Sequence, residues 1–493
     1  MYRQFIAIII YENNIKLCDE IMSSLGIKIK ETEVPKYIQI YNEIKKLIDE
    51  NRLKDGFKLP TIRVLANELK VNKATVISAY KKLQDDGYVI QKIGSGTFVK
   101  KIDGGRNIKK IYKDLFKKIT TEKLGKYIDF TGETASTTLF SVEVFKDVIN
   151  KVLERDGTKA LIYQELLGYE GLRKSIVENF WNNSMRADDV LIVSGAQQGL
   201  DIVTKALINN QEGVVIEKPT YSGALAVFNW RRANIHEVEI EMDGINIEKL
   251  ENILRKNKIK FLYLMSYFQN PTGATYSEEK KKKILNLASI YDFYIIEDDY
   301  LSELIYDTNI IYKSFKQLDQ NNRVIYIKSF SKIFLPGIRL GYLIAPPEFR
   351  EKIQNAKINS DIATSSLMQR ALELYINSGY WREYIEKLNK IYLGRYTYMT
   401  NKIEEYLSDF IEQESPGGGM NLYLKLKDNV NIKSHDLFQL CKKDFVLITP
   451  GSIFYKNISE GSRYFRIGFS QTDEKQIEEG LRRIATILKK YKQ

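Results

Sequence analysis

The stretch Ser329-Phe330-Ser331-Lys332 and the stretch Pro336-Gly337-Ile338-Arg339-Leu340-Gly341 together decide the fold of this chain. The apolar run Val324–Ser329 is typical of a buried strand, so Lys332 comes just after the strand's carboxyl end. A lysine there, beside small hydroxyl side chains, is a candidate Schiff-base amine. Arg339, seven residues further on, can bind a phosphate through two parallel hydrogen bonds. A lone lysine in a chain with 75 Lys and Arg is usually surface charge, so this interpretation depends on other segments.

A second segment, Ser194-Gly195-Ala196-Gln197-Gln198-Gly199, follows the strand-like run Val190–Val193 and opens a predicted helix. The amides of Ala196 and Gln197 at such a helix start can hold a phosphate, and the helix dipole favours its negative charge. An ordinary strand-to-helix turn has the same pattern, so the segment is ambiguous by itself.

Two further segments end strands with polar side chains. Asn270 lies in Phe268-Gln269-Asn270-Pro271-Thr272-Gly273, after the run Lys260–Met265, although such a sequence is also a natural turn. Glu297-Asp298-Asp299-Tyr300 ends the strand Tyr294–Glu297. Open α/β sheets bind ligands at the carboxyl ends of their strands, so these side chains are expected at one crevice. A partly buried carboxylate there needs a cation or a protonated nitrogen as its partner.

From about residue 127 to the end, strand and helix patterns alternate, which predicts a large α/β domain with a mainly parallel sheet. Residues from about 350 onward indicate a smaller α+β lobe. The expected strands are Val190–Val193, Gly213–Glu217, Lys260–Met265, Tyr294–Glu297, Val324–Ser329 and Leu340–Ala345.

Together the four segments resemble the fold-type I, aspartate aminotransferase-like family of pyridoxal phosphate proteins, over residues 127–493. The resemblance implies that Lys332 forms the internal aldimine and that Asp298 keeps the pyridine nitrogen protonated. The further cofactor contacts that it implies are Asn270 and Tyr300 to the ring oxygen, and Ser329, Arg339 and the amides of Ala196 and Gln197 to the phosphate.

The same resemblance assigns three more residues. Tyr221 matches the aromatic side chain that stacks on the cofactor ring, and Arg466 matches the arginine that grips a substrate or effector carboxylate. Tyr163 matches a tyrosine that reaches the phosphate from the neighbouring subunit. Plain aromatic packing would also explain Tyr163 and Tyr221 in a chain with 32 tyrosines. The chain departs from the family at Ala196, where a hydroxyl often binds phosphate, and in the loop 163–173, which lacks the usual proline and glycine pattern.

Ahead of this domain, residues 34–101 predict a winged helix-turn-helix. Helices are expected over 36–50, over 61–70 and after Asn72, and a hairpin should follow. The residues that shape these elements are Thr61 and Asn72 as N-caps, Val76, Tyr80 and Leu83 as the inner face of the third helix, Gly87 as its stop, and the runs Tyr88–Lys92 and Thr97–Lys101 as the two strands of the wing.

The third helix would lie in the major groove, with Lys73 and Thr75 in its first turn and Ser78 one turn on. Arg63 can reach a phosphate, and Gly94 and Gly96 in the wing let the backbone approach DNA closely. A winged helix used only for protein contacts is the alternative. The segments that resemble the GntR family of bacterial regulators are Leu59-Pro60-Thr61-Ile62-Arg63-Val64-Leu65-Ala66, Val71-Asn72-Lys73-Ala74-Thr75-Val76 and Gly94-Ser95-Gly96-Thr97-Phe98-Val99.

That resemblance implies that Arg63, Lys73, Thr75 and the glycine wing contact operator DNA. The chain has Thr61 and Asn72-Lys73 where Ser and Ser-Arg are commoner in the family. The bases that this helix reads therefore do not follow from the family pattern.

The excess positive charge lies in one block. Residues 34–101 hold 14 Lys/Arg against 7 Asp/Glu, and residues 102–126 hold 8 against 3, which accounts for the whole formal net charge of +12. Such concentration is typical of a protein that binds a polyanion, although a solvated Lys-rich face leaves the same pattern. Residues 102–126, with a basic helix expected over 108–119, are interpreted as a linker.

With 493 residues, 44% of them hydrophobic, the chain can form several folded domains, and wholesale disorder is excluded. It has no apolar run of the ~18–20 residues that a membrane span needs. Two cysteines cannot build a disulfide framework, which predicts a cytoplasmic protein, and two histidines argue against a metal site. Residues 1–33 form an N-terminal extension, in which Phe5–Tyr11 predicts a strand or docking segment rather than a signal peptide.

A GntR-like winged helix joined by a basic linker to an aminotransferase-like domain is the layout of the MocR subfamily. This resemblance predicts a homodimeric, head-to-tail transcription regulator that binds operator DNA and senses pyridoxal phosphate or its adduct with an amino acid or amine. A working aminotransferase, converting amino acid to 2-oxo acid beside a DNA-binding module, is the alternative. A plain dimerisation scaffold with no attached cofactor is a third hypothesis.

Overall fold

The computed structural model of the chain describes residues 27, 29, 34–49, 52–85, 88–92, 95–99, 127–132, 134–162, 165–361 and 363–492. It has two compact units, Met1–Thr121 and Glu122–Gln493. The domain limits expected at 33/34, 101/102 and 126/127 stay predictions, because the residues around them lie outside the described ranges. The same holds for the run Phe5–Tyr11, the helix over 108–119 and the stop at Gly87.

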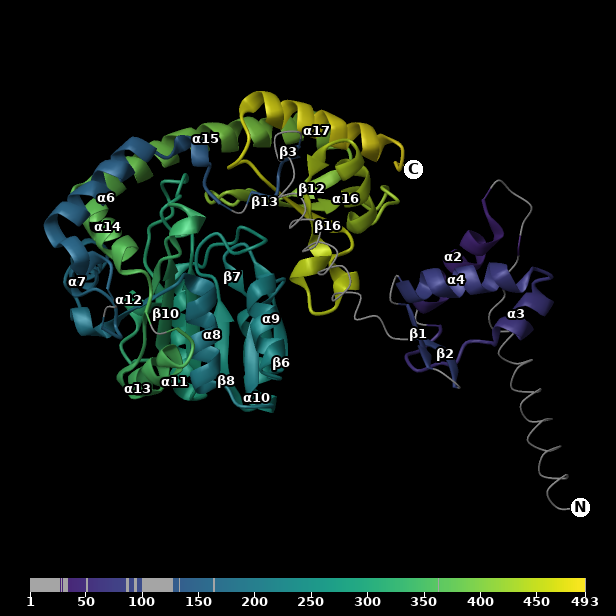
Figure 1. Ribbon diagram of the computed structural model, residues 1–493, viewed down its shortest axis with the longest axis horizontal. Helices are drawn as coiled ribbons and strands as arrows, with labels where there is room; N and C mark the ends of the chain where they lie inside the picture. The colour runs from purple at the N-terminus through teal and green to yellow at the C-terminus, as the bar shows by residue number, and fades with distance from the viewer. Residues whose placement is uncertain are drawn as a thin grey trace, which may run out of the picture. The chain divides into compact units, whose positions relative to one another are not determined.

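The first unit contains the helices and the hairpin expected of a winged helix-turn-helix (Figure 1). Thr61 caps the second helix, since its Oγ1 accepts from Val64 N at 3.3 Å, and Asn72 Oδ1 accepts from Ala74 N at 3.0 Å before the third. The elements are α2 (Lys36–Asp49), α3 (Ile62–Glu68), α4 (Lys73–Asp85), β1 (Val89–Lys92) and β2 (Gly96–Val99).

The core of this unit is the expected inner face of α4 packed on α2 and α3. Val76, Tyr80 and Leu83 are fully buried in one apolar cluster. The one polar atom of this trio, the Tyr80 hydroxyl, donates to the Pro60 carbonyl at 2.8 Å, which satisfies it inside the core. Burial of this face leaves the opposite face of α4 to solvent.

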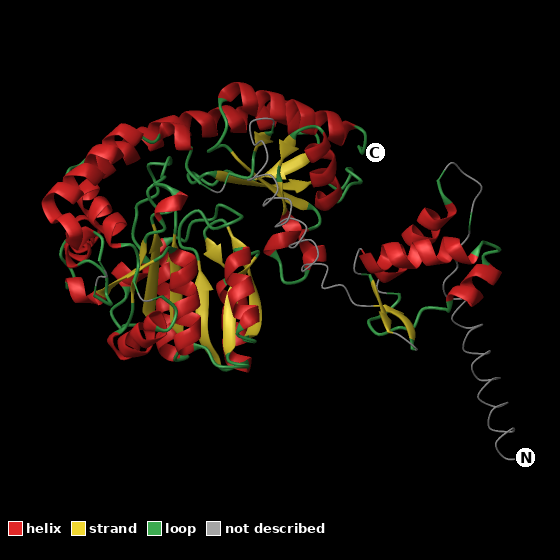
Figure 2. Cartoon of the chain, viewed as in Figure 1, coloured by secondary structure: helices red, strands yellow, loops and turns green. Residues whose placement is uncertain are grey.

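In the second unit, an eight-stranded sheet has the order β4-β11-β10-β9-β8-β5-β6-β7 in the described residues (Figure 2). β10, β9, β8, β5 and β6 run parallel, and β11 runs antiparallel to both of its neighbours. All six expected strands are present, and the mainly parallel α/β prediction is confirmed. The strands are β4 (Val190–Val193), β5 (Gly213–Lys218), β6 (Asn234–Glu241), β7 (Gly244–Ile245), β8 (Ile259–Leu264), β9 (Tyr294–Asp299), β10 (Val324–Ser329) and β11 (Gly341–Ile344).

Helices cover this sheet on both faces. α8 lies on β4, β10 and β11 and packs against α13, whereas α10 and α11 contribute Leu250, Leu254 and Ile284 to the core on the other face. The bounds of the helices around the sheet are α6 (Val142–Asp156), α7 (Glu170–Trp181), α8 (Ala196–Leu207), α9 (Ser222–Trp230), α10 (Ile247–Lys256), α11 (Glu278–Ile290), α12 (Phe315–Leu318), α13 (Arg350–Ile358) and α14 (Ser366–Asn377).

A smaller lobe is built on an antiparallel sheet of order β12-β13-β16-β15. The expectation that this lobe begins near residue 350 was wrong, because α13 packs against α8 of the large domain. In addition, β3 pairs with β14 and so brings the start of the second unit into the lobe. Its elements are β3 (Ile128–Asp129), β12 (Ile411–Gln413), β13 (Asn421–Leu426), β14 (Val446–Leu447), β15 (Thr449–Pro450), β16 (Tyr464–Gly468), α16 (Ser434–Lys443) and α17 (Glu474–Lys489).

One long helix, α15 (Tyr380–Leu407), joins the large sheet to the small lobe (Figure 1). Near its start the Tyr384 hydroxyl donates to the Ile333 carbonyl at 3.1 Å, and further along Arg395 Nη1 donates to the Ser470 carbonyl at 2.7 Å. Gly394 lies at its middle, and a Cβ added there would meet nothing within 4 Å. Neither this helix nor any other described one is long and apolar enough to cross a membrane.

Candidate cofactor site and DNA-binding face

Lys332 lies in the turn directly after β10, half-buried, at the carboxyl edge of the large sheet. Its positive charge is among the influences that lower the pKa of Asp298, so the two side chains lie in the same part of this edge. Asp298 lies on β9, beside β10, with Ile327 as its Cα partner. The lysine and the carboxylate singled out in the sequence therefore meet at the crevice where open α/β sheets bind ligands.

Asp298 is buried with half of its carboxylate unsatisfied. Oδ2 accepts from the Tyr263 hydroxyl at 2.8 Å, whereas Oδ1 has no hydrogen-bond partner in the described part of the chain. Burial raises the pKa of Asp298 from 3.8 to about 6, against the bond from Tyr263. A buried acceptor without a donor fits the protonated ring nitrogen of pyridoxal phosphate.

Asn270 and Arg466 join the two lobes above this crevice. Arg466, on β16, is fully buried, and its Nη1 donates to Asn270 Oδ1 at 2.6 Å. Its Nη2 donates to the Thr131 carbonyl at 2.9 Å, and its Nε has no partner among the described residues. A buried guanidinium held by an amide oxygen and a backbone carbonyl fits the expected grip on a ligand carboxylate.

The residues expected to hold the phosphate gather around Gly195, the N-cap of α8. Arg339 Nη2 donates to the Ser194 carbonyl at 2.7 Å, and a Cβ built on Gly195 would lie 3.4 Å from Arg339 Nη2 and 3.5 Å from Ser331 Oγ. Ser331, which was not among the expected phosphate ligands, is buried, and its Oγ has no hydrogen-bond partner among the residues that the structure describes. The amides of Ala196 and Gln197 belong to the first turn of α8, where a helix leaves N–H groups without intrahelical acceptors.

Ser329, the last residue of β10, is buried opposite Gly341, on the same side of the strand as Ile327. Strand alternation gives these two residues one face, and Ile327 on it packs near Gly199 of α8. Ser329 therefore lies on the side of the sheet where the phosphate residues gather.

Two tyrosines of the expected site make hydrogen bonds of their own. Tyr221 is the N-cap residue of α9, and its hydroxyl donates to Gln197 Oε1 at 3.3 Å, which places its ring beside the start of α8. Tyr300 is buried, and its hydroxyl donates to the Phe268 carbonyl at 2.6 Å. Tyr163 lies outside the described residues. In the part of the chain that the structure describes, no His, Cys, Asp or Glu group is arranged to hold a metal ion.

Glu217, at the end of β5, is a buried residue that sequence reasoning missed. Its Oε1 accepts from Met265 N at 3.0 Å and from the Tyr276 hydroxyl at 2.8 Å, and its Oε2 accepts from Gln269 Nε2 at 3.0 Å. The bond to Gln269 holds the residue directly before Asn270. Burial raises the pKa of Glu217 from 4.5 to about 8, although these three donors lower it.

Glu217→Gln should therefore change how the stability of the cofactor-free protein depends on pH. The folded pKa lies above the unfolded one, so the stabilising contribution of Glu217 is complete below about pH 4.5 and is lost as pH rises toward 8. We expect the wild type to lose stability relative to Glu217→Gln between pH 5 and 8, in urea unfolding followed at several pH values. Glu143→Gln, at a side chain 85% exposed, is the matched control and should keep the wild-type slope. A constant difference between wild type and Glu217→Gln would contradict the assignment.

The proposed DNA face of the first unit is exposed as expected. Lys73, Ser78 and Arg63 are exposed, Thr75 is half-buried, and Gly96 opens β2 with φ +114°. Ile77, on the same outer face of α4, is 49% exposed, an apolar side chain that sequence reasoning did not select. Gly94 lies outside the described residues.

Comparison with known proteins gives two family matches. Residues 134–484 match the aminotransferase class I and II family, and residues 36–99 match the gntR family of bacterial regulatory proteins. Aromatic-amino-acid aminotransferase 1 of Thermococcus litoralis is 31% identical over 76% of this chain and 91% of its own length. The uncharacterized HTH-type transcriptional regulator YdfD of Bacillus subtilis is 27% identical over 93% of this chain and 98% of its own length.

Among solved structures, the second unit is similar to Pyrococcus horikoshii kynurenine aminotransferase in complex with PMP. The two share 31% identity over 77% of this chain and 94% of that chain, with a TM-score of 0.72. With the unpaired Asp298 oxygen and the Ser331 hydroxyl at the crevice, this likeness identifies the cofactor as pyridoxal phosphate. The chain belongs to the aminotransferase class I and II family and, through the gntR-family domain at its N-terminal end, to the MocR subfamily of transcription regulators.

Proposed function

We propose that this regulator binds operator DNA through its winged helix and senses an amino acid or amine through pyridoxal phosphate held in its second unit. The observation that carries the proposal is the presence, in one chain, of an exposed basic recognition helix and of a buried site that holds Lys332, Asp298 and Arg466. A DNA-binding protein of this kind acts in the cytoplasm. We keep 34–101, 102–126 and 127–493 as its proposed domains.

In the proposed site each side chain has a distinct task. When bound, pyridoxal phosphate supplies an electrophilic carbonyl carbon and an electron-withdrawing ring. The Lys332 amine holds that carbon, the Asp298 carboxylate balances the charge of the ring nitrogen, and Tyr221 covers the ring. Asn270 and Tyr300 orient the ring oxygen, while Ser329, Arg339 and the amides of Ala196 and Gln197 bind the phosphate.

Regulation would come from a difference in affinity between two arrangements of the protein. Arg466 binds the ligand carboxylate, and because it links β16 to Asn270 on the large domain, its occupancy acts on the contact between the lobes. A coupling of ~1–3 kcal/mol between this site and the DNA site is enough for a useful change in DNA affinity.

The experiment that tests the function measures binding to DNA from upstream of the protein's own gene, at fixed salt, with and without pyridoxal phosphate and a panel of amino acids and amines. Salt must be constant because phosphate contacts dominate affinity. A change in sequence-specific affinity on adding cofactor or amine is expected. Absence of specific binding under every condition would contradict the proposal that the protein is a regulator.

On the DNA side, α4 is proposed to read the major groove, with Lys73, Thr75 and Ser78 toward the DNA and Arg63 and the wing residues Gly94 and Gly96 at the backbone. Ile77, exposed between Lys73 and Ser78, is suited to contact a thymine methyl group.

Lys73→Ala should weaken operator binding and lower the slope of log affinity against log salt by about 1, because one phosphate contact is lost. Lys81→Ala, an exposed lysine two turns further along α4, is the matched control and should change the slope less. Fluorescence anisotropy over a salt series gives both the affinity for the operator and its salt slope. An unchanged slope in Lys73→Ala, with α4 still folded, would refute the recognition-helix assignment.

The dimer is part of the same proposal. Leu161 and Ile162 are 66% and 59% exposed and directly precede Tyr163, the residue expected to reach the partner's phosphate. Apolar side chains exposed beside that position support a head-to-tail homodimer in which each chain completes the other's site. Sedimentation equilibrium should give twice the chain mass.

A working aminotransferase is the second candidate, since Lys332, Asp298 and the buried Arg466 are all present and the similar enzymes noted above carry out this chemistry. Multiple turnovers with a 2-oxo acid acceptor would show it. A single half-reaction without turnover would favour the sensor.

A further inference from the structure

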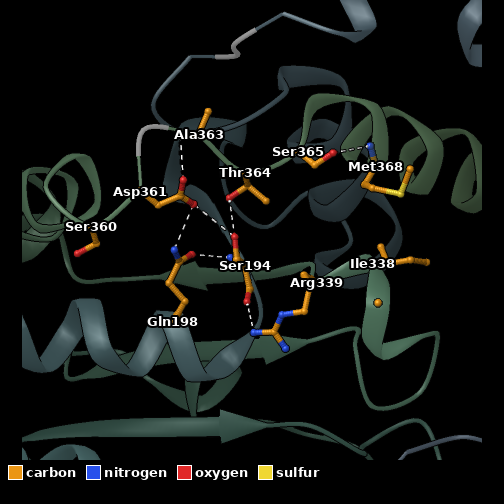
Figure 3. Close-up of a pocket in the computed structure, with 11 residues that line it drawn as sticks. Ser194, Gln198, Ile338, Arg339, Ser360, Asp361, Ala363, Thr364, Ser365 and Met368 are labelled. Atoms are coloured by element: carbon orange, nitrogen blue, oxygen red, sulfur yellow. Dashed lines mark hydrogen bonds between the residues drawn. The ribbon is translucent and has the colours of Figure 1, made fainter. Parts of the chain in front are cut away.

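Ser194, the residue before the phosphate-binding helix start, is fixed through every polar atom it has. Its N–H donates to Gln198 Oε1 at 2.6 Å, its carbonyl accepts from Arg339 Nη2 at 2.7 Å, and its Oγ donates to Asp361 Oδ2 at 3.4 Å. The same Oγ lies 3.4 Å from Thr364 Oγ1. Figure 3 shows Gln198, Asp361, Thr364 and Arg339 arranged around Ser194.

Asp361 is the centre of this network. Its Oδ2 accepts from Lys357 Nζ at 2.8 Å and from Gln198 Nε2 at 3.2 Å, in addition to Ser194, and its Oδ1 accepts from Ala363 N at 3.2 Å. Burial alone would raise the pKa of Asp361, but the bonds from Lys357 and Gln198 outweigh burial and hold it below its ordinary value. Asp361 is therefore a charged residue that bonds both Ser194 and the side chain holding the Ser194 N–H.

The charge of Asp361 is balanced locally. Lys357, whose side chain is 2% exposed, forms the ion pair and also donates to Thr364 Oγ1 at 3.2 Å. A neutral pair of this kind can stand beside a phosphate without repelling it. A cavity of about 620 Å³ lies next to the network, lined among others by Ser194, Arg339 and Asp361.

We infer that Asp361 is a positioning residue for the cofactor phosphate, acting through Ser194 and Gln198 on the amides of Ala196 and Gln197. The inference rests on the proposed phosphate site. The phosphate is bound by backbone groups whose direction depends on the junction between β4 and α8, and Asp361 bonds both Ser194 in the connecting loop and Gln198 in the first turn of α8. Because Asp361 acts through Ser194 and Gln198, its effect is on alignment and should be specific to the phosphate.

The test compares pyridoxal phosphate with pyridoxal, which lacks the phosphate but keeps the ring and the carbonyl carbon. Dissociation constants are measured by absorbance titration for the wild type, Asp361→Asn and Gln198→Met. We expect the dissociation constant for pyridoxal phosphate to rise about tenfold in both variants, because the phosphate loses the equivalent of roughly one well-aligned hydrogen bond. The dissociation constant for pyridoxal should change less than about twofold.

Gln198→Met keeps the ion pair of Asp361 intact, so it decides the question even where Asp361→Asn fails to fold. The control is Asp319→Asn, at the amino end of β10, where a buried carboxylate bonds Arg323 N and Val324 N away from the ligand crevice. It should leave the ratio of the two constants at the wild-type value.

Equal losses for both ligands, or no loss for either, in Gln198→Met would overturn the inference and leave the cofactor site standing. A wild type that binds neither pyridoxal phosphate nor pyridoxal would overturn the cofactor assignment itself, and this inference with it.

Discussion

Lys332→Ala should abolish the visible absorption band of lysine-bound pyridoxal phosphate, because the amine that acts on Asp298 from the turn after β10 is removed, whereas Lys328 Nζ, near the end of β10, is bonded to Asp299, Ser302 and Glu303. The fold should survive, since Lys332 is a half-buried residue in a turn and not part of the core. Borohydride reduction followed by peptide mapping should label Lys332 in the wild type and no lysine in the variant. Lys332→Arg, which keeps the charge but cannot form the bond, should behave like Lys332→Ala.

The strongest alternative to Lys332 as the lysine that binds pyridoxal phosphate is Lys281, a buried amine whose pKa is lowered by burial to about 8. Its Nζ donates to the Tyr267 hydroxyl at 3.0 Å and to the Lys313 carbonyl at 2.8 Å. A label found on Lys281, or a band retained in Lys332→Ala, would remove Lys332 from its role.

Asp298→Asn should weaken pyridoxal phosphate binding roughly 100-fold, since truncating one partner of a buried charge pair costs about 2–5 kcal/mol. The affinity of the wild type for pyridoxal phosphate, relative to that of Asp298→Asn, should fall as pH falls through about 6, where Asp298 takes up a proton and loses its charge. The ratio of the two dissociation constants, measured from pH 5 to 8, separates this effect from the protonation of the cofactor itself.

An unchanged affinity in Asp298→Asn would mean that another group pairs with the ring nitrogen. Asp299 is its neighbour but lies on the opposite face of β9, where Lys328 Nζ donates to it at 3.0 Å and the Tyr326 hydroxyl at 2.8 Å. With both oxygens of Asp299 bonded, that outcome would argue against a carboxylate partner altogether.

The sequence predicted those parts of the molecule whose signals are local. The caps Thr61 and Asn72, the inner face with Tyr80, and the six apolar strands each depend on residues within a few positions of one another, and all were confirmed. β6 was missed because Asn234–Glu241 alternates apolar residues with His and Glu, and so lacks the continuous apolar run of its neighbours.

Sequence reasoning missed the contacts that join distant segments. Ser194 and Asp361 are hydrogen-bonded although they lie 167 positions apart in the sequence, and Gln269 and Glu217 are hydrogen-bonded at a separation of 52. No sequence periodicity predicts either contact. A turn serine such as Ser331 became meaningful only when its hydroxyl was found buried and unpaired beside Gly195. Chemistry at the ends of strands can be predicted from pattern, whereas the side chains that support it depend on the tertiary fold.

The long helix α15 behaves as a strut about 42 Å long, at 1.5 Å per residue over its 28 residues. One end is tied to the turn that carries Lys332, and the other is tied through the Tyr406 hydroxyl and Glu478 of α17 to the lobe that carries Arg466. Gly394 at its midpoint costs roughly 1 kcal/mol of helix stability relative to alanine, and no neighbour requires the missing methyl group. The strut is therefore softest halfway along, so a swing of the arginine lobe can be absorbed there as bending before it reaches the lysine turn.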